Sequence, residues 1–82
     1  MIEGNLYVFS MPLGMDKEDL TEGIDQGLTL AMCGRLLGSG MSLGEESTVC
    51  MEIGAYDRDK ANHVISRFFR KMKCRDFEMS WD

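Results

Sequence analysis

Apolar and polar residues alternate in two segments of the chain, with the period of two that is typical of half-buried β-strands. In residues 49–55, Val, Met, Ile and Ala alternate with Cys, Glu and Gly. In residues 77–81, Phe, Met and Trp alternate with Glu and Ser. A third segment, residues 5–10, is rich in strand-forming side chains and follows a glycine. These patterns predict three strands.

Between residues 57 and 72 the apolar spacing changes to that of a helix. Apolar side chains recur there three or four positions apart. They are Ala61, Val64, Ile65, Phe68 and Met72. Asp57 and Asp59 precede this stripe, and either can accept the hydrogen bond that caps a helix N-terminus. We therefore expect a helix that begins near these aspartates.

A second helix is predicted from Asp16 to about Leu37, with Glu18 and Asp19 adding favourable charge to its first turn. The Gly-Ser-Gly segment at residues 38–40 is expected to end it. Its apolar stripe consists of Leu20, Ile24, Leu28 and Ala31. Three glycines lie within it, and each costs about 1 kcal/mol relative to alanine. Glycines 23, 27 and 34 thus indicate either close packing or a helix that ends early.

The order of the elements predicts the fold class. Residues 41–43 suit a short edge strand, and residues 44–47 suit a turn into the strand at 49–55. The resulting order, β-α-(β)-β-α-β, is that of the ferredoxin-like split β-α-β arrangement. We predict one α+β domain over residues 1–82, with two helices on one face of a three- or four-stranded, mainly antiparallel sheet. The predicted core is Val49, Ile53, Val64, Phe68, Phe77 and Trp81.

Charge is unevenly distributed along the 82 residues, whose net charge is −5. Residues 1–56 carry two positive and nine negative charges, whereas residues 57–82 carry seven positive and five negative ones. An acidic balance argues against general binding to nucleic acids or membrane surfaces, because both select for basic proteins. We accordingly expect no membrane contact and no direct contact with nucleic acid.

The cysteines suggest a reducing compartment. Cys33, Cys50 and Cys74 are odd in number and widely spaced, with no Cys-x-x-Cys pair. Glu3 stands where a signal peptide would carry a basic residue. We therefore expect a cytoplasmic protein whose three thiols are reduced.

No group of residues predicts catalysis, a cofactor or a metal. The single histidine, His63, has cations rather than a carboxylate or hydroxyl as its neighbours on the helix, apart from Asp59. The Asp-Arg-Asp segment at 57–59 lacks the glycine and glutamate of a calcium loop. Of the eight methionines, Met51, Met72 and Met79 fall on apolar stripes and are expected in the core. No cysteine or histidine lies close enough in sequence to Met11 and Met15, which flank the loop after the first strand, to complete a copper site with them. The protein is accordingly predicted not to be an enzyme.

A cationic stripe flanks the apolar stripe of the 57–72 helix. It consists of His63, Arg67, Arg70, Lys71 and Cys74. It can serve an acidic partner, or it can pair with acids of the other helix. The second interpretation is favoured, with Asp19, Glu22 and Asp25 as the partners, because charged helix faces are usually solvated or internally paired.

Outward-facing aromatic residues predict a contact surface. Tyr7 and Phe9 are opposite in phase to the core residues of their strand, as is Tyr56 in its own. RNA-recognition sheets stack bases on such aromatics, but residues 47–54 do not match their signature, and Glu52 would repel a phosphate. The predicted partner-binding residues are Tyr7, Phe9, Glu45, Glu46, Glu52 and Tyr56.

The leading hypothesis is a small acidic inhibitor or adaptor that occupies a basic surface of a larger protein, for instance one that handles nucleic acids. Antagonists from phages and mobile elements are of this kind, by analogy of size and charge. A homodimer through the aromatic face is also predicted, because exposed apolar patches mark interfaces. The alternative is a self-associating regulatory domain that binds a small ligand at the loop after the first strand or at the dimer interface.

Overall fold

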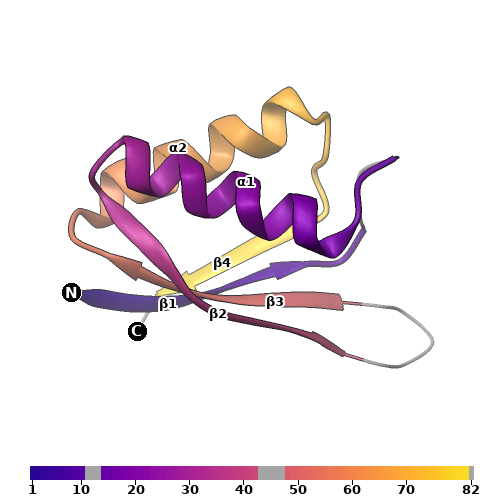
Figure 1. Ribbon diagram of the computed structural model, residues 1–82, viewed down its shortest axis with the longest axis horizontal. Coiled ribbons are helices and arrows are strands. Elements are labelled where there is room, and N and C mark those ends of the chain that lie inside the picture. Colours follow the sequence, from indigo (N-terminus) through magenta and orange to yellow (C-terminus); the bar gives the residue numbers. More distant parts are fainter. Residues whose placement is uncertain (11–13, 43–47, 82) are drawn as a thin grey trace.

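The computed structural model describes residues 1–10, 14–42 and 48–81. Its elements are β1 (Ile2–Val8), α1 (Lys17–Leu30), β2 (Gly34–Ser42), β3 (Thr48–Ala55), α2 (Arg58–Lys71) and β4 (Phe77–Trp81). The four strands form one antiparallel sheet, and both helices lie on the same face of it (Figure 1). The predicted α+β class, with two helices on one sheet face, is confirmed.

In the strand order β2-β3-β1-β4, strands from the two halves of the chain alternate in the sheet. α1 connects β1 to β2, and β3 lies between those strands; α2 connects β3 to β4, and β1 lies between those. The ladder between the central strands runs from Ile2 opposite Ala55 to Val8 opposite Val49. β2 and β4 are therefore the edge strands of the sheet.

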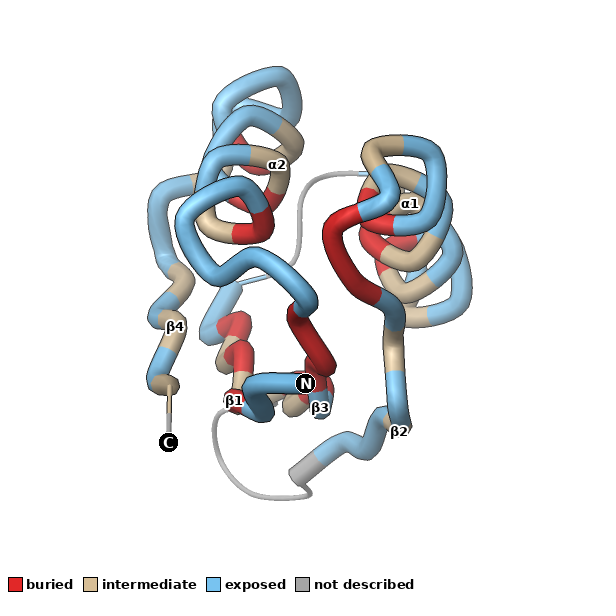
Figure 2. The backbone as a smooth tube through the Cα atoms, turned by 90° about the vertical axis from the view of Figure 1, so that its left-hand side faces the viewer, coloured by how far each residue is buried: buried red, intermediate tan, exposed pale blue. Residues whose placement is uncertain are grey.

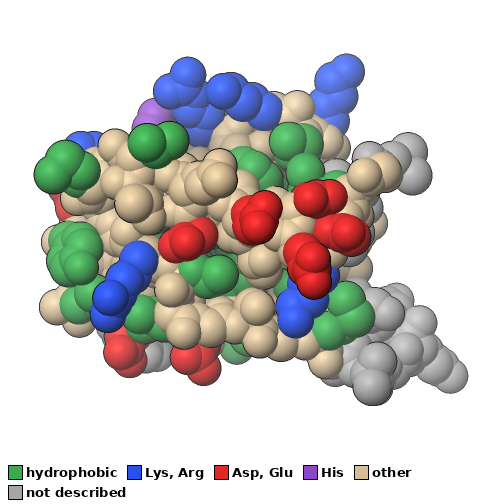
Figure 3. All heavy atoms as spheres, viewed as in Figure 1, with side chains coloured by type: hydrophobic (Ala, Val, Ile, Leu, Met, Phe, Trp, Pro, Cys, Tyr) green, Lys and Arg blue, Asp and Glu red, His purple; other side chains and the backbone are tan. Residues whose placement is uncertain are grey.

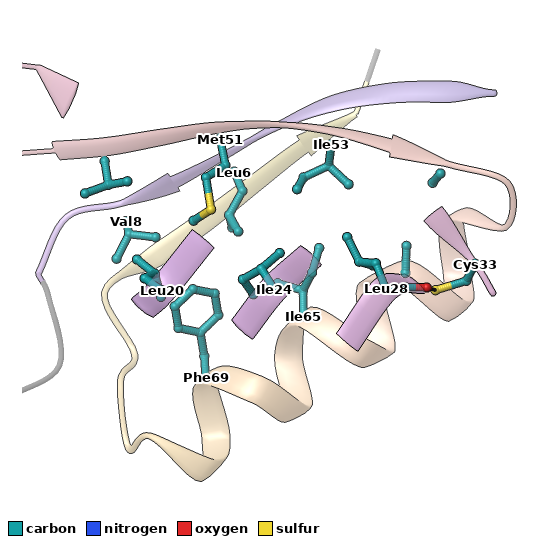
Figure 4. Close-up of a cluster of buried hydrophobic side chains, with 13 residues drawn as sticks. Leu6, Val8, Leu20, Ile24, Leu28, Cys33, Met51, Ile53, Ile65 and Phe69 are labelled. Carbon is teal, nitrogen blue, oxygen red and sulfur yellow. Dashed lines mark hydrogen bonds between the residues drawn. The ribbon is translucent and has the colours of Figure 1, made fainter. Parts of the chain in front are cut away.

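The hydrophobic core lies between the sheet and the helix pair (Figure 2). Leu6 and Met51 from the central strands point toward Ile24 of α1 and toward Ile65 and Phe69 of α2 (Figure 4). Val49 and Ile53 are buried, as predicted. The other four predicted core residues, Val64, Phe68, Phe77 and Trp81, are partly buried and pack against this core.

The prediction for α2 had the right helix but the wrong central residue. The stripe that faces the sheet is Ala61, Ile65 and Phe69, and Phe69 is the largest fully buried side chain. Phe68, one residue earlier, is turned by about 100° around the helix and meets α1 instead. Met72, the last member of the predicted stripe, is exposed. The helix has two adjacent apolar stripes, and the sequence does not show which of them faces the sheet. One stripe contacts the sheet, and the other contacts α1.

The predicted extent of the first helix is wrong, because α1 ends at Leu30 rather than near Leu37. The reversal takes place at Met32, whose φ of 55° is in the left-handed region. The backbone N–H groups of Met32 and Cys33 donate to the carbonyl oxygens of Thr29 and Leu28, which is a Schellman motif. Methionine rather than glycine occupies the left-handed position, so the usual sequence signal of a helix end is missing.

Residues 38–40, predicted to end a helix, instead lie in the middle of β2. This strand has nine residues, and the predicted edge strand at 41–43 is its last part, with Leu43 outside the described residues. The β2–β3 register shifts between Leu36 and Gly38, so that Leu37 is the extra residue of a β-bulge. Gly34, predicted within the helix, begins the strand.

The glycines of α1 lie where the two helices approach. A Cβ added at Gly23 would lie 2.5 Å from Cε2 of Phe68, and one at Gly27 would lie 3.1 Å from Cγ1 of Val64. Of the two explanations that the sequence allowed, close packing applies to these two residues. The two glycines therefore allow Phe68 and Val64 of α2 to pack directly against the α1 backbone.

The two helical segments are structural repeats, although the sequence shows no repeat. Both helices have 14 residues, and each is capped by an aspartate, Asp16 or Asp57, that accepts from the third helical N–H. Each also ends in a Schellman motif with a positive φ, the second at Lys73. A cysteine follows each reversal. The two helical segments therefore resemble each other in how their helices begin and end and in where their buried residues lie, but not in residue identity.

Candidate functional site

The sheet face that neither helix covers, called the open face below, carries the predicted site residue Tyr7. Side chains alternate along each strand, so the residues between the buried ones point to this face. On β1 these are Glu3, Asn5 and Tyr7; on β3, Thr48, Cys50 and Glu52; on β4, Glu78 and Ser80. Across the strands, Asn5 lies between Glu52 and Ser80, and Tyr7 lies between Cys50 and Glu78.

The described part of the open face has a negative balance of charge. Glu3, Glu52 and Glu78 come from three different strands, and Arg35 on β2, paired with Gly54, supplies a positive charge. All four side chains are exposed. The three glutamates are far apart in the sequence, so the sequence alone does not bring them together. Once the strand pairing is known, side-chain alternation assigns Glu78 to the same face as Glu52.

Glu52 stands between two hollows on the open face. One, of about 350 Å³, is lined by Gly38, Ser39, Gly40, Cys50 and Glu52. The other, of about 160 Å³, is lined by Glu3, Gly4, Asn5, Leu37 and Glu52. The first exists because Gly38 and Gly40 put no side chain beside β3. This role was not predicted, because a Gly-Ser-Gly segment after a helical pattern is also typical of a helix end.

The predicted aromatic patch is not formed by its three members. Tyr7 is half-buried near one end of the β1–β3 ladder, and Phe9 follows the last residue of β1 at that same end. Tyr56 follows β3 at the opposite end, about 25 Å away along the strands. The antiparallel register therefore separates Phe9 from Tyr56. Glu45 and Glu46, the remaining predicted partner residues, lie outside the described residues.

A second charged surface follows the outer side of α2. Residues 60–75 include six Lys or Arg side chains and no acid. Figure 3 shows Lys and Arg gathered along the rim that α2 forms, while Asp and Glu gather over α1. Among residues 1–10, 14–42 and 48–81, the ion pair within 4.0 Å is that of Arg58 with Asp59.

The favoured interpretation of the cationic stripe is therefore wrong. It required ion pairs between α2 and the acids of α1, and the described residues show none between the two helices. Asp25 instead accepts a hydrogen bond of 3.0 Å from the backbone N–H of Leu36, which ties α1 to β2. The two helices contact each other where Phe68 and Val64 of α2 lie against Gly23 and Gly27 of α1. The α2 cations are left at the surface.

Another hollow lies between the end of α2 and the start of β4. It measures about 760 Å³ and is called the α2–β4 hollow below. Its lining consists of Ser66, Arg70, Lys73, Cys74, Arg75 and Phe77. A neighbouring hollow of about 340 Å³ shares Ser66 and Arg70 and adds His63, Arg67 and Lys71. Four of the five residues of the predicted stripe line the second hollow, and Cys74 lines the first.

The three thiols are free and differ in their surroundings. Burial raises the pKa of the Cys33 thiol, and nearby Asp57 adds to that rise, while Lys60 opposes it. Cys33 also contacts the Leu28 carbonyl oxygen at 3.7 Å. Cys50 lies on the open face, and Cys74 donates to the Ser10 carbonyl oxygen at 3.3 Å. Cys33 and Cys74 thus have structural contacts of their own.

Other kinds of site are not indicated by the described residues. No group of three or more His, Cys, Asp and Glu side chains in them is arranged to hold a metal ion. None of the helices in this part of the chain has the length and apolar character needed to cross a bilayer. Comparison of the chain with protein-family models, with curated proteins and with solved structures gives no match.

Proposed function

We propose that this protein is a non-enzymatic binding module that occupies a basic surface of a larger protein through its open face, as a small inhibitor or adaptor does. The observation that carries the proposal is the position of Glu52. Its exposed carboxylate stands between two hollows, each of which can receive a Lys or Arg side chain. Charge-assisted hydrogen bonds of this kind are about twice as strong as neutral ones.

The residues around Glu52 support the same function. Glu3 and Glu78 surround it with further negative charge, which speeds encounter with a basic partner and disfavours acidic ones. Tyr7 adds a half-buried aromatic ring next to the acids, and tyrosine is enriched in protein interfaces. Proteins that handle nucleic acids carry basic surfaces for phosphate, so they are the partner class that this face suits.

Self-association is the alternative, as a homodimer in which the open faces of two copies meet. Its original reason was a shared patch of Tyr7, Phe9 and Tyr56, and the register separates two of these. A two-fold contact through this face would also bring the glutamates of both copies together, which is unfavourable. Sedimentation of the wild type as a monomer at high micromolar concentration would exclude the homodimer. A wild-type dimer that the Glu52→Lys substitution dissociates would instead favour self-association over the binding of a basic partner.

The experiment that tests the proposal is affinity capture from lysate of the source cells with wild-type and variant bait, followed by binding of the purified partner. We expect one basic protein to be retained at low salt and released at high salt, because screening weakens such contacts. Glu52→Lys should lower the affinity of the purified partner at least about tenfold, since a charge is reversed in the contact.

The matched control is Glu22→Lys, which makes the same change of charge on the exposed side of α1. It should retain the partner with nearly wild-type affinity. Equal losses for both variants would mean that the partner responds only to net charge. A partner retained by Glu52→Lys would place the contact elsewhere, and either result would refute the role of the open face.

A further inference from the structure

We infer that the α2–β4 hollow is a second binding site, for a compact polyphosphate anion such as pyrophosphate or the phosphate chain of a nucleotide. Its lining residues belong to α2, to the segment that follows α2 and to the start of β4. α2 lies on the covered side of the sheet, opposite the open face proposed for the protein partner (Figure 2). Three cations, Arg70, Lys73 and Arg75, line the hollow, and Ser66 contributes a hydroxyl. Its volume of about 760 Å³ is within the range of small-molecule sites.

Hydrogen bonds fix the backbone that carries these cations. At the end of α2, the N–H groups of Lys73 and Cys74 donate to the carbonyl oxygens of Arg70 and Phe69, at 3.1 and 3.0 Å. The Cys74 thiol donates to Ser10. The chain therefore turns sharply between Arg70 and Arg75, which brings cations from the helix, the turn and the connector to one hollow.

The floor of the hollow is connected to the core. The Phe77 ring lines the hollow and stacks on the buried Phe69 ring, with centroids 4.2 Å apart and an interplanar angle of 16°. The N–H of Phe9 donates to the Asp76 carbonyl oxygen at 2.8 Å, which ties this segment to the end of β1. An anion would thus meet cations carried by a backbone that is already ordered, so that only their side chains have to be ordered on binding.

Helix stability alone does not account for these cations. Lys and Arg in the last turn of a helix interact favourably with its dipole, which explains Arg70 and Lys71. Lys73 and Arg75 lie beyond the helix end, and Arg75 is part of the connector to β4. In the part of the chain that the structure describes, none of the three lining cations has a carboxylate within 4.0 Å.

The ligand is compact because the basic region is small. Residues outside 60–75 carry an excess of negative charge, with Asp76 and Glu78 following directly and acids covering α1. An extended polyanion, such as single-stranded RNA, would leave the cations and enter this negative field. Two or three linked phosphates match three cations without reaching it, and Arg binds phosphate in a bidentate manner.

Titration of the ¹⁵N-labelled protein with pyrophosphate at about 0.15 M salt tests the inference, because weak surface attraction is screened there. We expect saturable amide shifts confined to the hollow, with apparent Kd below about 1 mM. Arg70→Gln should weaken binding about tenfold, as expected for loss of one charged hydrogen bond. Arg58→Gln, on the same helix but outside the hollow, should leave binding unchanged.

Several results would overturn the inference. They are the absence of saturation with the wild type, shifts spread over all cationic segments, and equal losses for Arg70→Gln and Arg58→Gln. A dodecamer of single-stranded RNA that binds the same amides more than tenfold tighter than pyrophosphate would make the surface an extended nucleic-acid site instead. Because Arg70 is exposed, Arg70→Gln should lose only its favourable interaction with the helix dipole, so its thermal unfolding should stay cooperative and close to that of the wild type. A large loss of binding in such a folded variant separates binding from folding.

Discussion

At the scale of single residues, two glycines of β2 have opposite surroundings and predict opposite effects of a methyl group. Among the described residues, nothing lies within 4 Å of a Cβ added at Gly40. A Cβ added at Gly34 would collide with the carbonyl oxygen of Gly54. Gly40→Ala should therefore raise the free energy of unfolding by up to about 1 kcal/mol, because glycine is unfavourable in strands.

Gly34→Ala should lower the free energy of unfolding by about 2 kcal/mol or more, since a backbone atom of the central strand β3 would have to move. Urea denaturation of the two variants and the wild type measures both changes. Equal effects of the two substitutions would contradict the β2–β3 contact at Gly34.

Cys33 makes stability depend on pH on the alkaline side. Burial raises the pKa of its thiol in the folded protein. An unfolded thiol ionises near pH 8.5, so below that pH both states are protonated and the stabilisation is complete. Above it only the unfolded state ionises, and the free energy of unfolding falls until the pH passes the folded pKa, by at most about 1.4 kcal/mol per pH unit.

Urea midpoints of the wild type, Cys33→Ala and Cys50→Ala between about pH 7 and 10 check this expectation. All other ionisable groups are the same in these proteins apart from the substituted cysteine, so the comparison rests on the differences between the three pH profiles. Cys33→Ala should show the smaller alkaline loss and Cys50→Ala the wild-type loss. An unchanged pH profile for Cys33→Ala would show that its thiol does not couple folding to protons.

At the scale of elements, the approach of the two helices depends on Gly23. Replacing a helical glycine by alanine normally stabilises a helix by about 1 kcal/mol. Here the new Cβ would lie 2.5 Å from the Phe68 ring, which would have to leave its position against α1. Gly23→Ala is therefore expected to lower the free energy of unfolding by about 1–3 kcal/mol.

A double-mutant cycle with Phe68→Leu isolates the contact, because a smaller side chain leaves room for the methyl group. Gly23→Ala should be less harmful, or stabilising, in the Phe68→Leu background. Gln26→Ala, an exposed position of α1, is the control and should have little effect. A Gly23→Ala variant as stable as the wild type or more so would contradict the close helix approach.

At the scale of the whole molecule, the fold converts a charge difference along the chain into two separate surfaces. The open face carries glutamates from β1, β3 and β4, while the cations of residues 60–75 line the outer side of α2. The helix layer and its core lie between the two surfaces (Figure 2). The proposed protein partner and the proposed anion can therefore bind without competing for the same residues.

The sequence predicted those features that depend on neighbouring residues. Strand alternation placed β3 and β4 and assigned Glu52 and Tyr7 to the face opposite the core. The boundaries of α1 and β2 were wrong because Met32, a residue that rarely adopts a positive φ, makes the reversal. With the helix predicted to run to Leu37, Gly38 and Gly40 fit a helix end rather than a strand, so the sequence does not predict the hollow beside Glu52.

Hydrophobic periodicity and charge are local properties of the chain, so they were enough to predict the fold class, the phase of the strands and the position of the cationic segment. The packing of the helices on the sheet, by contrast, turns Phe69 rather than Phe68 toward the sheet, although both residues fit a helical stripe. The tertiary structure also decided that Phe9 and Tyr56 lie apart and that Ser66, Arg75 and Phe77 share one hollow. Those relations depend on strand register and on the packing of distant segments, which no local pattern encodes.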